Sequence, residues 1–396
     1  MQPTRRSVVL SSAAALAAGA AGLRPSFAAA EPFKIGWPVT LTGPGSAPGL
    51  SFDLGVRYAV DRLNAKGGAG GHRIELVTRD TQGDPTKAVN IVQELISSEK
   101  VSAIFGPTNS GEALAITPIM ARFGVPNVHA GTIDSLIDPV KYPNAFRIAP
   151  AGKQWDAALR HYVLAVRKWK KVGILGDTTG YGTTAVSDSV AGFKKDGGEV
   201  VYSATIDQTQ ADVTPQLLSM RKAGAEAIVV WSVSSGLEAR IMNTRAQLGW
   251  DSPILGHPTM GSNDVRKLLD KPSNFDKVYV VGFRSCTRDA SGKLPARTQA
   301  FIDEVRGKMD LKRAILFLVL IGVDGIDLLA KAVAETGSTS RKAIIDYLNT
   351  VKDFPGLFGT YSFSPTDHDG YQTTEVVMCA ADSLKDGALA QAPGYD

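Results

Sequence analysis

Hydroxyl and amide side chains cluster in two loops, Thr108–Ser110 and Ala130–Thr132, each of which follows a short apolar run. Hydroxyls and free backbone N–H groups at the start of a helix hold a carboxylate well. Taken alone, the first loop equally fits a simple helix cap at Asn109 or Ser110. Two such loops after neighbouring parallel strands meet at one edge of a sheet, so together they favour a ligand site there.

A comparable loop lies in the second half of the chain, at Asp177–Gly182, and contains Tyr181. This tyrosine is expected either to close over a ligand or to pack on the helix that follows. His257 lies near the end of another apolar run, where the alternatives are a place in a cleft and a loop histidine bonded to backbone. The candidate ligand-binding residues are Thr108, Asn109, Ser110, Ala130, Gly131, Thr132, Tyr181, Ser232 and His257.

Motifs of catalysis and of metal binding are absent from the sequence. It contains no GxSxG elbow, no HExxH pair and no P-loop, and its five histidines lack metal-type spacing. The loop Thr42–Gly49 resembles a dinucleotide fingerprint, with Asp80 as ribose partner, but its glycine spacing is wrong. We therefore expect that the protein is not an enzyme, has no catalytic residues and binds no metal or cofactor. An exported oxidoreductase that holds a nicotinamide is the weaker alternative.

Residues 1–30 have the composition of an export signal. Arg5 and Arg6 precede an apolar stretch from Val8 to Leu23, and a run of small residues ends at Ala30. The arginine pair indicates the twin-arginine pathway, with an ordinary Sec signal as the alternative. We expect cleavage after Ala30, which leaves a soluble protein in the periplasm.

The net charge of the chain depends on that segment. The full sequence has 43 Lys and Arg against 39 Asp and Glu, a net charge of +4, but three of the arginines lie in residues 1–30. The remainder, with a net charge of +1, offers no electrostatic case for binding nucleic acid or an anionic membrane. Its two cysteines, Cys286 and Cys379, fit either one disulfide or two buried thiols.

Apolar runs alternate with amphipathic segments along the rest of the chain. Phe33–Val39 predicts a strand, and Thr86–Ser98 predicts a helix with one apolar stripe. This alternation with short connections predicts parallel sheets covered by helices, and it restarts near Ala157, which predicts two lobes of similar architecture. The apolar stretch Ala314–Val323 predicts a helix buried on most sides, because Asp324 cuts it short for a membrane span.

Several of these segments together resemble the branched-chain amino-acid-binding proteins of ABC importers, which have the type I periplasmic binding fold. The resemblance covers nearly all of the chain after the signal. Its carriers are Phe33–Pro44, Asp61–Gly68, Asp80–Pro85, Val101–Ser110, Gly124–Pro126, Phe146-Arg147 and Gly180–Gly182. It implies an α/β fold of two doubly wound parallel-sheet lobes, joined by a hinge that the chain crosses three times, near Ala149, Phe283 and Phe358.

The resemblance also implies how the chain is divided. The N-terminal lobe comprises residues 31–149 and 284–357, and the C-terminal lobe comprises residues 150–283 and 358–396. Its partners are a small-molecule ligand and the permease subunits of an ABC importer, and we expect a monomer. Closure of the lobes traps the ligand, and the closed form is what the permease recognises.

In the same family pattern, Ser110, Ala130 and Thr132 hold the carboxylate of the ligand, and Tyr181 closes over it. The implied ligand is a branched-chain or related amino acid. No carboxylate lies near His257, where such proteins pair the ligand ammonium, and an unpaired buried ammonium is costly. An aromatic or other hydrophobic carboxylate, or an amide, is therefore the alternative ligand. A ligand-sensing domain of a regulator or receptor is the alternative function.

Overall fold

The computed structural model describes residues 30–43, 45–312, 314–371 and 376–395. The chain divides into two units, Met1–Glu31 and Pro32–Asp396, and the described helices and strands belong to the second unit. Except for Ala30, the expected export signal lies outside the described residues. Its pathway and its cleavage site therefore stay predictions.

The first sheet of the second unit has five parallel strands in the order β2-β1-β3-β4-β5. The apolar strand β1, which pairs with β2 on one side and with β3 on the other, is buried along almost its whole length, as expected for a strand covered on both faces. The strands are β1 (Phe33–Val39), β2 (Ile74–Asp80), β3 (Ala103–Phe105), β4 (Asn127–His129) and β5 (Ala145–Arg147).

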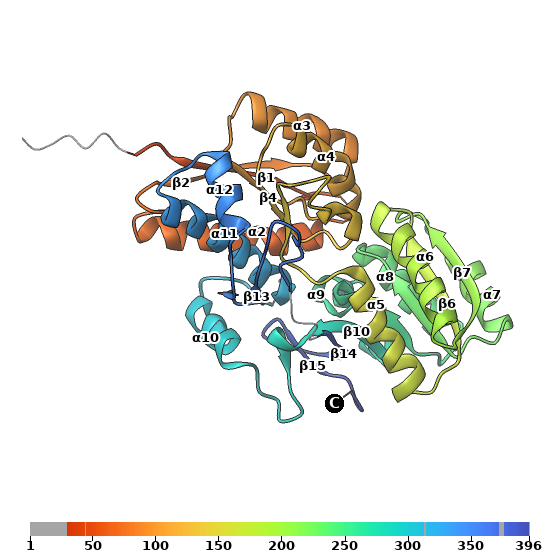
Figure 1. The fold of residues 1–396 in the computed structure, drawn as a ribbon. Coiled ribbons are helices and arrows are strands. Elements are labelled where there is room, and N and C mark those ends of the chain that lie inside the picture. The colour runs from red at the N-terminus through yellow and green to blue at the C-terminus, as the bar shows by residue number, and fades with distance from the viewer. Residues whose placement is uncertain (1–29, 44, 313, 372–375, 396) are drawn as a thin grey trace, which may run out of the picture. The chain divides into compact units, whose positions relative to one another are not determined.

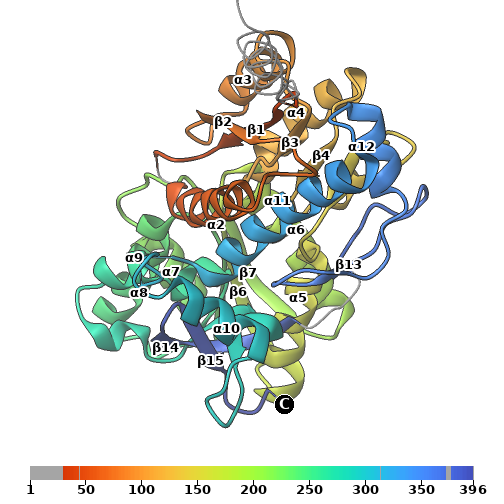
Figure 2. The ribbon, with the colours of Figure 1, turned by 90° about the vertical axis from the view of Figure 1, so that its left-hand side faces the viewer.

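Two pairs of helices enclose this sheet. Helices α2 and α11 pack against each other, and α3 and α4 form the other pair, with the strands between the pairs (Figure 1). Figure 2 shows α11 running beside α2, with α12 following at its far end. The bounds are α2 (Ser46–Ala65), α3 (Pro85–Ser97), α4 (Ser110–Arg122), α11 (Leu316–Thr336) and α12 (Arg341–Leu348).

The second sheet has the order β11-β15-β14-β10-β9-β8-β6-β7. Strands β6 to β10 are parallel, whereas β14 runs antiparallel to both β10 and β15, so an antiparallel edge extends the parallel sheet. The strands are β6 (Lys171–Asp177), β7 (Glu199–Ile206), β8 (Ala227–Trp231), β9 (Ile254–Gly256), β10 (Val278–Phe283), β11 (Thr287–Arg288), β14 (Val376–Lys385) and β15 (Ala388–Gln391).

Helices surround the second sheet as well, with α5 packed on α6 and α8 packed on both α7 and α9. A short hairpin, β12 (Phe354–Pro355) with β13 (Thr360–Tyr361), lies on the path from α12 back to β14. The helices are α5 (Gly152–His161), α6 (Gly180–Lys195), α7 (Thr214–Lys222), α8 (Ser235–Gln247), α9 (Asn263–Lys267) and α10 (Ala296–Val305).

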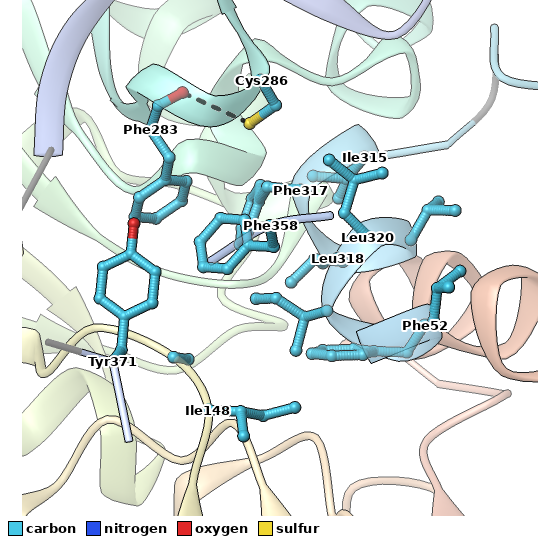
Figure 3. Packing of buried hydrophobic residues seen from close by; sticks show 14 of the residues in the cluster. Phe52, Ile148, Phe283, Cys286, Ile315, Phe317, Leu318, Leu320, Phe358 and Tyr371 are labelled. Carbon is cyan, nitrogen blue, oxygen red and sulfur yellow. Dashed lines mark hydrogen bonds between the residues drawn. The ribbon is translucent and has the colours of Figure 1, made fainter. Parts of the chain in front are cut away.

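Helix α11 is the most deeply buried helix among those described, and it confirms the prediction of a core helix from the Ala314–Val323 run. Sixteen of its 21 residues are buried. Its first turn carries Phe317 and Leu318, which lie between Phe358 and Phe52 (Figure 3). Within the described ranges, no helix has the combination of length and hydropathy that crossing a bilayer requires.

The two α/β sheets with covering helices confirm the predicted fold class. The antiparallel strand β14 is an addition that the prediction of parallel sheets did not contain. The alternation was expected to restart near Ala157, and the helix found there begins earlier, at Gly152, and continues past His161 as a π-helical turn, Tyr162–Val166. The exact lobe boundaries stay a prediction. Both cysteines are buried with free thiols, which is the second of the two alternatives left open above.

Candidate functional site

A cavity lies where the carboxyl ends of strands from both sheets come together. Thr40 follows β1, Ala130 follows β4 and His257 follows β9, and all three line this cavity. The carboxyl edge of a parallel sheet is where α/β proteins bind ligands. Because both sheets contribute this edge, the cavity is a site shared by the two halves of the second unit.

The loop from β3 to α4 supplies Thr108, Asn109 and Ser110 to the cavity. Gly106 opens this loop with φ = 99°, and a Cβ there would lie 2.8 Å from the Trp37 ring, so the close approach requires glycine. Asn109 is the N-cap of α4, because its Oδ1 accepts a hydrogen bond from the Gly111 N–H at 2.7 Å. The capping and the cavity positions expected as alternatives are therefore both found.

Ser110 connects this loop to the next one. Its hydroxyl oxygen accepts a hydrogen bond from the Thr132 N–H at 3.5 Å, and the Ser110 side chain is almost fully buried. Ser110 is also the first residue of α4, where the backbone N–H groups of the first turn and the helix dipole give a positive local potential. The site can thus stabilise a negative charge without a cationic side chain.

Arg147, at the end of β5, stabilises the Thr132 loop through hydrogen bonds and ion pairs. The guanidinium is fully buried, donates to the Thr132 carbonyl at 3.5 Å and pairs with Asp134 at 3.0 Å. It also makes two hydrogen bonds to the Asp369 carboxylate, at 3.1 and 2.6 Å. One side chain therefore ties the loop that lines the cavity to the segment that leads into β14.

Tyr181 enters the cavity from the first turn of α6. The helix is capped by Thr179, whose hydroxyl accepts a hydrogen bond from the Gly182 N–H at 3.1 Å. The buried Tyr181 hydroxyl has no hydrogen-bond partner within the described part of the chain. Burial, with the nearby Asp177 and Glu238 carboxyls, holds the pKa of Tyr181 well above its usual value, so the phenol stays protonated and able to donate.

His257 forms the neighbouring wall. Its Nδ1 accepts a hydrogen bond from the Thr259 N–H at 3.1 Å, and burial lowers the pKa of the imidazole to about 3. The ring is therefore neutral at physiological pH, with its proton on Nε2. It packs edge-on against Tyr181, with ring centroids 5.2 Å apart, and against Trp155, with centroids 5.4 Å apart.

Large apolar side chains that sequence analysis missed complete the lining. Trp155 comes from α5, Phe52 from α2, and Phe317 with Leu318 from the start of α11. Figure 3 shows Phe52, Phe317 and Leu318 close together. The buried Trp155 Nε1–H has no hydrogen-bond partner among the described residues, so it is available to a ligand acceptor.

Seven of the nine candidate residues lie on this cavity, namely Thr108, Asn109, Ser110, Ala130, Thr132, Tyr181 and His257. Gly131 does not, because it faces the side chains of Leu136 and His129 instead. Ser232 does not either, since its hydroxyl is buried and accepts the Ser234 N–H at 3.0 Å, while the adjacent Val233 lines the cavity. Ligand contact by the seven residues stays a prediction.

The two halves touch beside the cavity. Helices α4 and α6 contact each other near their N-termini, where Gly111 and Gly180 meet. A Cβ added to Gly180 would lie 3.0 Å from the Gly111 Cα. Only glycine therefore permits this approach without a shift of the backbone.

A second cavity adjoins the first and shares Thr132 and Tyr181 with it. In contrast to the first cavity, it is lined by acidic side chains, from Asp134, Asp156 and Asp188. Acidic side chains therefore line the second of these neighbouring cavities and not the first.

Comparison with known proteins gives a family match along almost the whole second unit. Residues 32–387 match the model of a family described as periplasmic binding protein. The chain is 28% identical, over 232 residues, to the Leu/Ile/Val-binding protein homolog 7 of Brucella suis. That match covers 57% of this chain and 56% of the relative, so the chain spans just over half the length of the first relatives that it matches.

Two solved structures resemble the fold over nearly its full extent. A periplasmic binding protein type 1 from Bordetella pertussis has a TM-score of 0.79 at 25% identity, with 92% of this chain and 100% of that chain covered. The branched-chain amino acid transporter substrate-binding protein LivJ from Streptococcus pneumoniae, in complex with isoleucine, has a TM-score of 0.78 at 25% identity. That likeness covers 91% of this chain and 98% of that one.

Proposed function

The chain belongs to the periplasmic binding protein family, and we propose that it captures a small organic carboxylate between its two lobes for an ABC importer. The observation that carries this proposal is the one cavity lined by Ser110 and Thr132 from one half and by Tyr181 and His257 from the other. In this proposal the captured solute is delivered to the permease subunits in the membrane. The protein acts in the periplasm as a monomer and performs no catalysis.

The carboxylate is held at the start of α4. Ser110 Oγ and the backbone N–H groups of the first helical turn donate hydrogen bonds to it, and the helix dipole adds favourable potential. The start of α6, at Tyr181, presents a second positive helix end to the same cavity. Hydrogen bonds to a charged acceptor contribute about 1.5–3 kcal/mol each, enough for selective capture of an anion.

The apolar part of the ligand packs on the aromatic side of the cavity, against Trp155, Phe52 and Phe317. Kinship with Leu/Ile/Val-binding homologues, and with a protein crystallised with isoleucine, supports a ligand that joins one carboxylate to a compact apolar group. A branched-chain or related amino acid meets this description, and so does a hydrophobic acid without an amine.

The test is a thermal-shift screen of the purified protein, freed of its export signal, against amino acids, aliphatic acids, aromatic acids and the corresponding amides. A ligand that binds only the folded state raises the melting temperature, by an amount that grows with its concentration. We expect at least one carboxylate to raise the melting temperature while its amide does not. No shift with any acid, or equal shifts with acid and amide, would contradict the proposal.

Closure depends on the glycine contact between the two halves. We expect a Gly180→Val variant to bind the best carboxylate of the screen at least tenfold more weakly (about 1.4 kcal/mol,), because the new side chain would meet Gly111 where the two halves touch. Gly236→Val, on α8, is the matched control, because only side-chain atoms lie near its new Cβ. Calorimetric titration of both variants makes the comparison, and equal affinities would show that closure does not bring these helices together.

A further inference from the structure

None of the described residues that line the first cavity carries a charged side chain. Its polar side chains are hydroxyls, the Asn109 amide, the Trp155 indole and the neutral His257 imidazole, and no Asp, Glu, Lys or Arg lines it. An anionic ligand group is compensated there by the N-termini of α4 and α6. A cationic ligand group has no such compensation.

The fixed dipoles of this cavity oppose a cation. The positive ends of α4 and α6 both face it, at Ser110 and Tyr181. The unpartnered Trp155 Nε1–H can only donate a hydrogen bond, and the His257 Nε2–H does the same while Nδ1 is occupied by Thr259. An ammonium needs acceptors in these places, and burying one without them is strongly unfavourable.

Two buried carboxyls lie close behind the walls without reaching the cavity. The Glu112 carboxyl accepts a hydrogen bond from Thr40 at 3.4 Å, and the Glu238 carboxyl accepts one from Thr259. Burial raises the pKa of Glu112 to about 7 and the pKa of Glu238 well above its usual value. Neither carboxyl lines the cavity, so neither replaces the missing partner for an ammonium.

The acids of the second cavity are mostly engaged. Asp134 pairs with Arg147 and Lys153, and Asp156 pairs with Arg160. Asp188 forms no ion pair within the described ranges and is exposed to solvent. It is the one acid of this cavity left for an ammonium, and it is separated from the carboxylate cradle by Thr132 and Tyr181.

We propose that the ligand is a hydrophobic or aromatic carboxylate that carries no ammonium group, so that the protein discriminates against the α-amino acid of the same shape. This inference rests on the function proposed above and narrows the ligand class of the same site. The uncharged donors of Trp155, Tyr181 and His257 are then positioned to bind a neutral acceptor, such as a carbonyl or hydroxyl oxygen, where an amino acid would place its ammonium.

Two matched ligand pairs test this directly by calorimetric titration of the wild-type protein. They are leucine with 4-methylpentanoate, and phenylalanine with 3-phenylpropanoate, and the members of each pair differ only in the ammonium group. We expect the acid without the ammonium to bind at least tenfold more tightly in at least one pair, and no amino acid to bind more tightly than its partner. Amino acids that bind as tightly as their partners, or more tightly, would overturn the inference and leave the proposed capture of carboxylates standing.

A different set of binding results would show that the proposed function itself is wrong. In that case neither member of either pair binds, and no carboxylate in the thermal-shift screen raises the melting temperature, which overturns the inference as well. If another acid raises it but neither pair binds, the same comparison is made with that acid and its α-amino counterpart. An affinity for the acid that is at least tenfold higher than the affinity for its α-amino counterpart supports the inference, and any smaller difference in affinity overturns it.

Two variants test which residues determine the preference for the acid over its α-amino acid. His257→Glu places a carboxylate in the wall, and we expect it to shift the ratio of affinities towards the amino acid by at least tenfold. Asp188→Asn is the control, and we expect it to leave the ratio unchanged, because the ammonium does not reach the second cavity. A ratio that responds to Asp188→Asn and not to His257→Glu would show that Asp188 pairs an ammonium, contrary to the inference.

Discussion

An Arg147→Ala variant is expected to lose about 3 kcal/mol of the free energy of unfolding, because removing one partner of a buried ion pair leaves uncompensated charge. The Arg147 side chain is fully buried and bonds to Asp369 twice, to Asp134 and to the Thr132 carbonyl. Its loss removes the buried guanidinium from beside the partly buried Asp369 carboxylate, and removes the packing of the long side chain. The same change loosens the Thr132 loop, so binding of a carboxylate is expected to weaken as well.

Urea denaturation at neutral pH measures the first effect, with Arg57→Ala as the matched control. Arg57 also pairs with an aspartate, Asp53, but it is half exposed, and exposed pairs contribute at most about 1 kcal/mol. If Arg147→Ala lowered the free energy of unfolding no more than Arg57→Ala does, the proposed stabilising role of Arg147 would be wrong.

An Asp324→Ala variant is expected to lose a similar amount, about 3 kcal/mol, because it leaves several buried donors without an acceptor. The Asp324 carboxyl, on the buried side of α11, accepts hydrogen bonds from the Leu357 N–H at 2.6 Å, the Phe358 N–H at 2.9 Å and the Tyr361 hydroxyl at 2.6 Å. It thereby fixes the hairpin β12–β13 and its turn to the helix that forms one wall of the cavity. The exposed Asp346, which pairs with Lys342, provides the control variant Asp346→Ala.

The loss at Asp324 is expected to depend on pH. Burial raises the pKa of Asp324 from 3.8 to about 7 in the folded protein, so folding takes up a proton between these values. The contribution of the group to stability is therefore largest below pH 4 and decreases as the pH rises towards 7. Urea denaturation at pH 5 and pH 7.5 should show the larger loss at pH 5. A loss that grows with pH would mean that the carboxylate form is the one the fold stabilises.

Much of the fold could be predicted because the long elements carry their pattern locally. The amphipathic stripe of α3 and the apolar run of β1 are legible from the sequence alone, and both are found. Helix α2 begins at Ser46, within the loop Thr42–Gly49 that the sequence predicts, because Pro48 is tolerated in the first turn of a helix. The three-residue strand β5 is too short to show a period, and the antiparallel pairing of β14 depends on partners distant in sequence.

The site could be predicted where its residues follow a strand, and not where packing brings them in. Ser110, Thr132 and His257 lie in loops at strand ends and all reach the cavity. Phe317 lies on α11, which is apolar on nearly every side, so no local pattern shows which of its residues face the cavity. Ser232 was expected where Val233 is found, since neighbouring residues beyond a strand point to opposite sides and an error of one position reverses the assignment.

The most direct test of capture between the lobes is calorimetric titration of Ser110→Ala and Thr132→Ala with the best carboxylate of the thermal-shift screen. Hydrogen bonds to a charged acceptor are worth about 1.5–3 kcal/mol, so each variant is predicted to bind at least tenfold more weakly. Their melting temperatures without ligand should stay within a few degrees of the wild type, because the one hydrogen bond that the Ser110 hydroxyl accepts, from the Thr132 N–H, is long at 3.5 Å and such a bond contributes about 1 kcal/mol or less. Unchanged affinity in both variants, with both proteins folded, would place the ligand elsewhere and contradict the proposed function of this cavity.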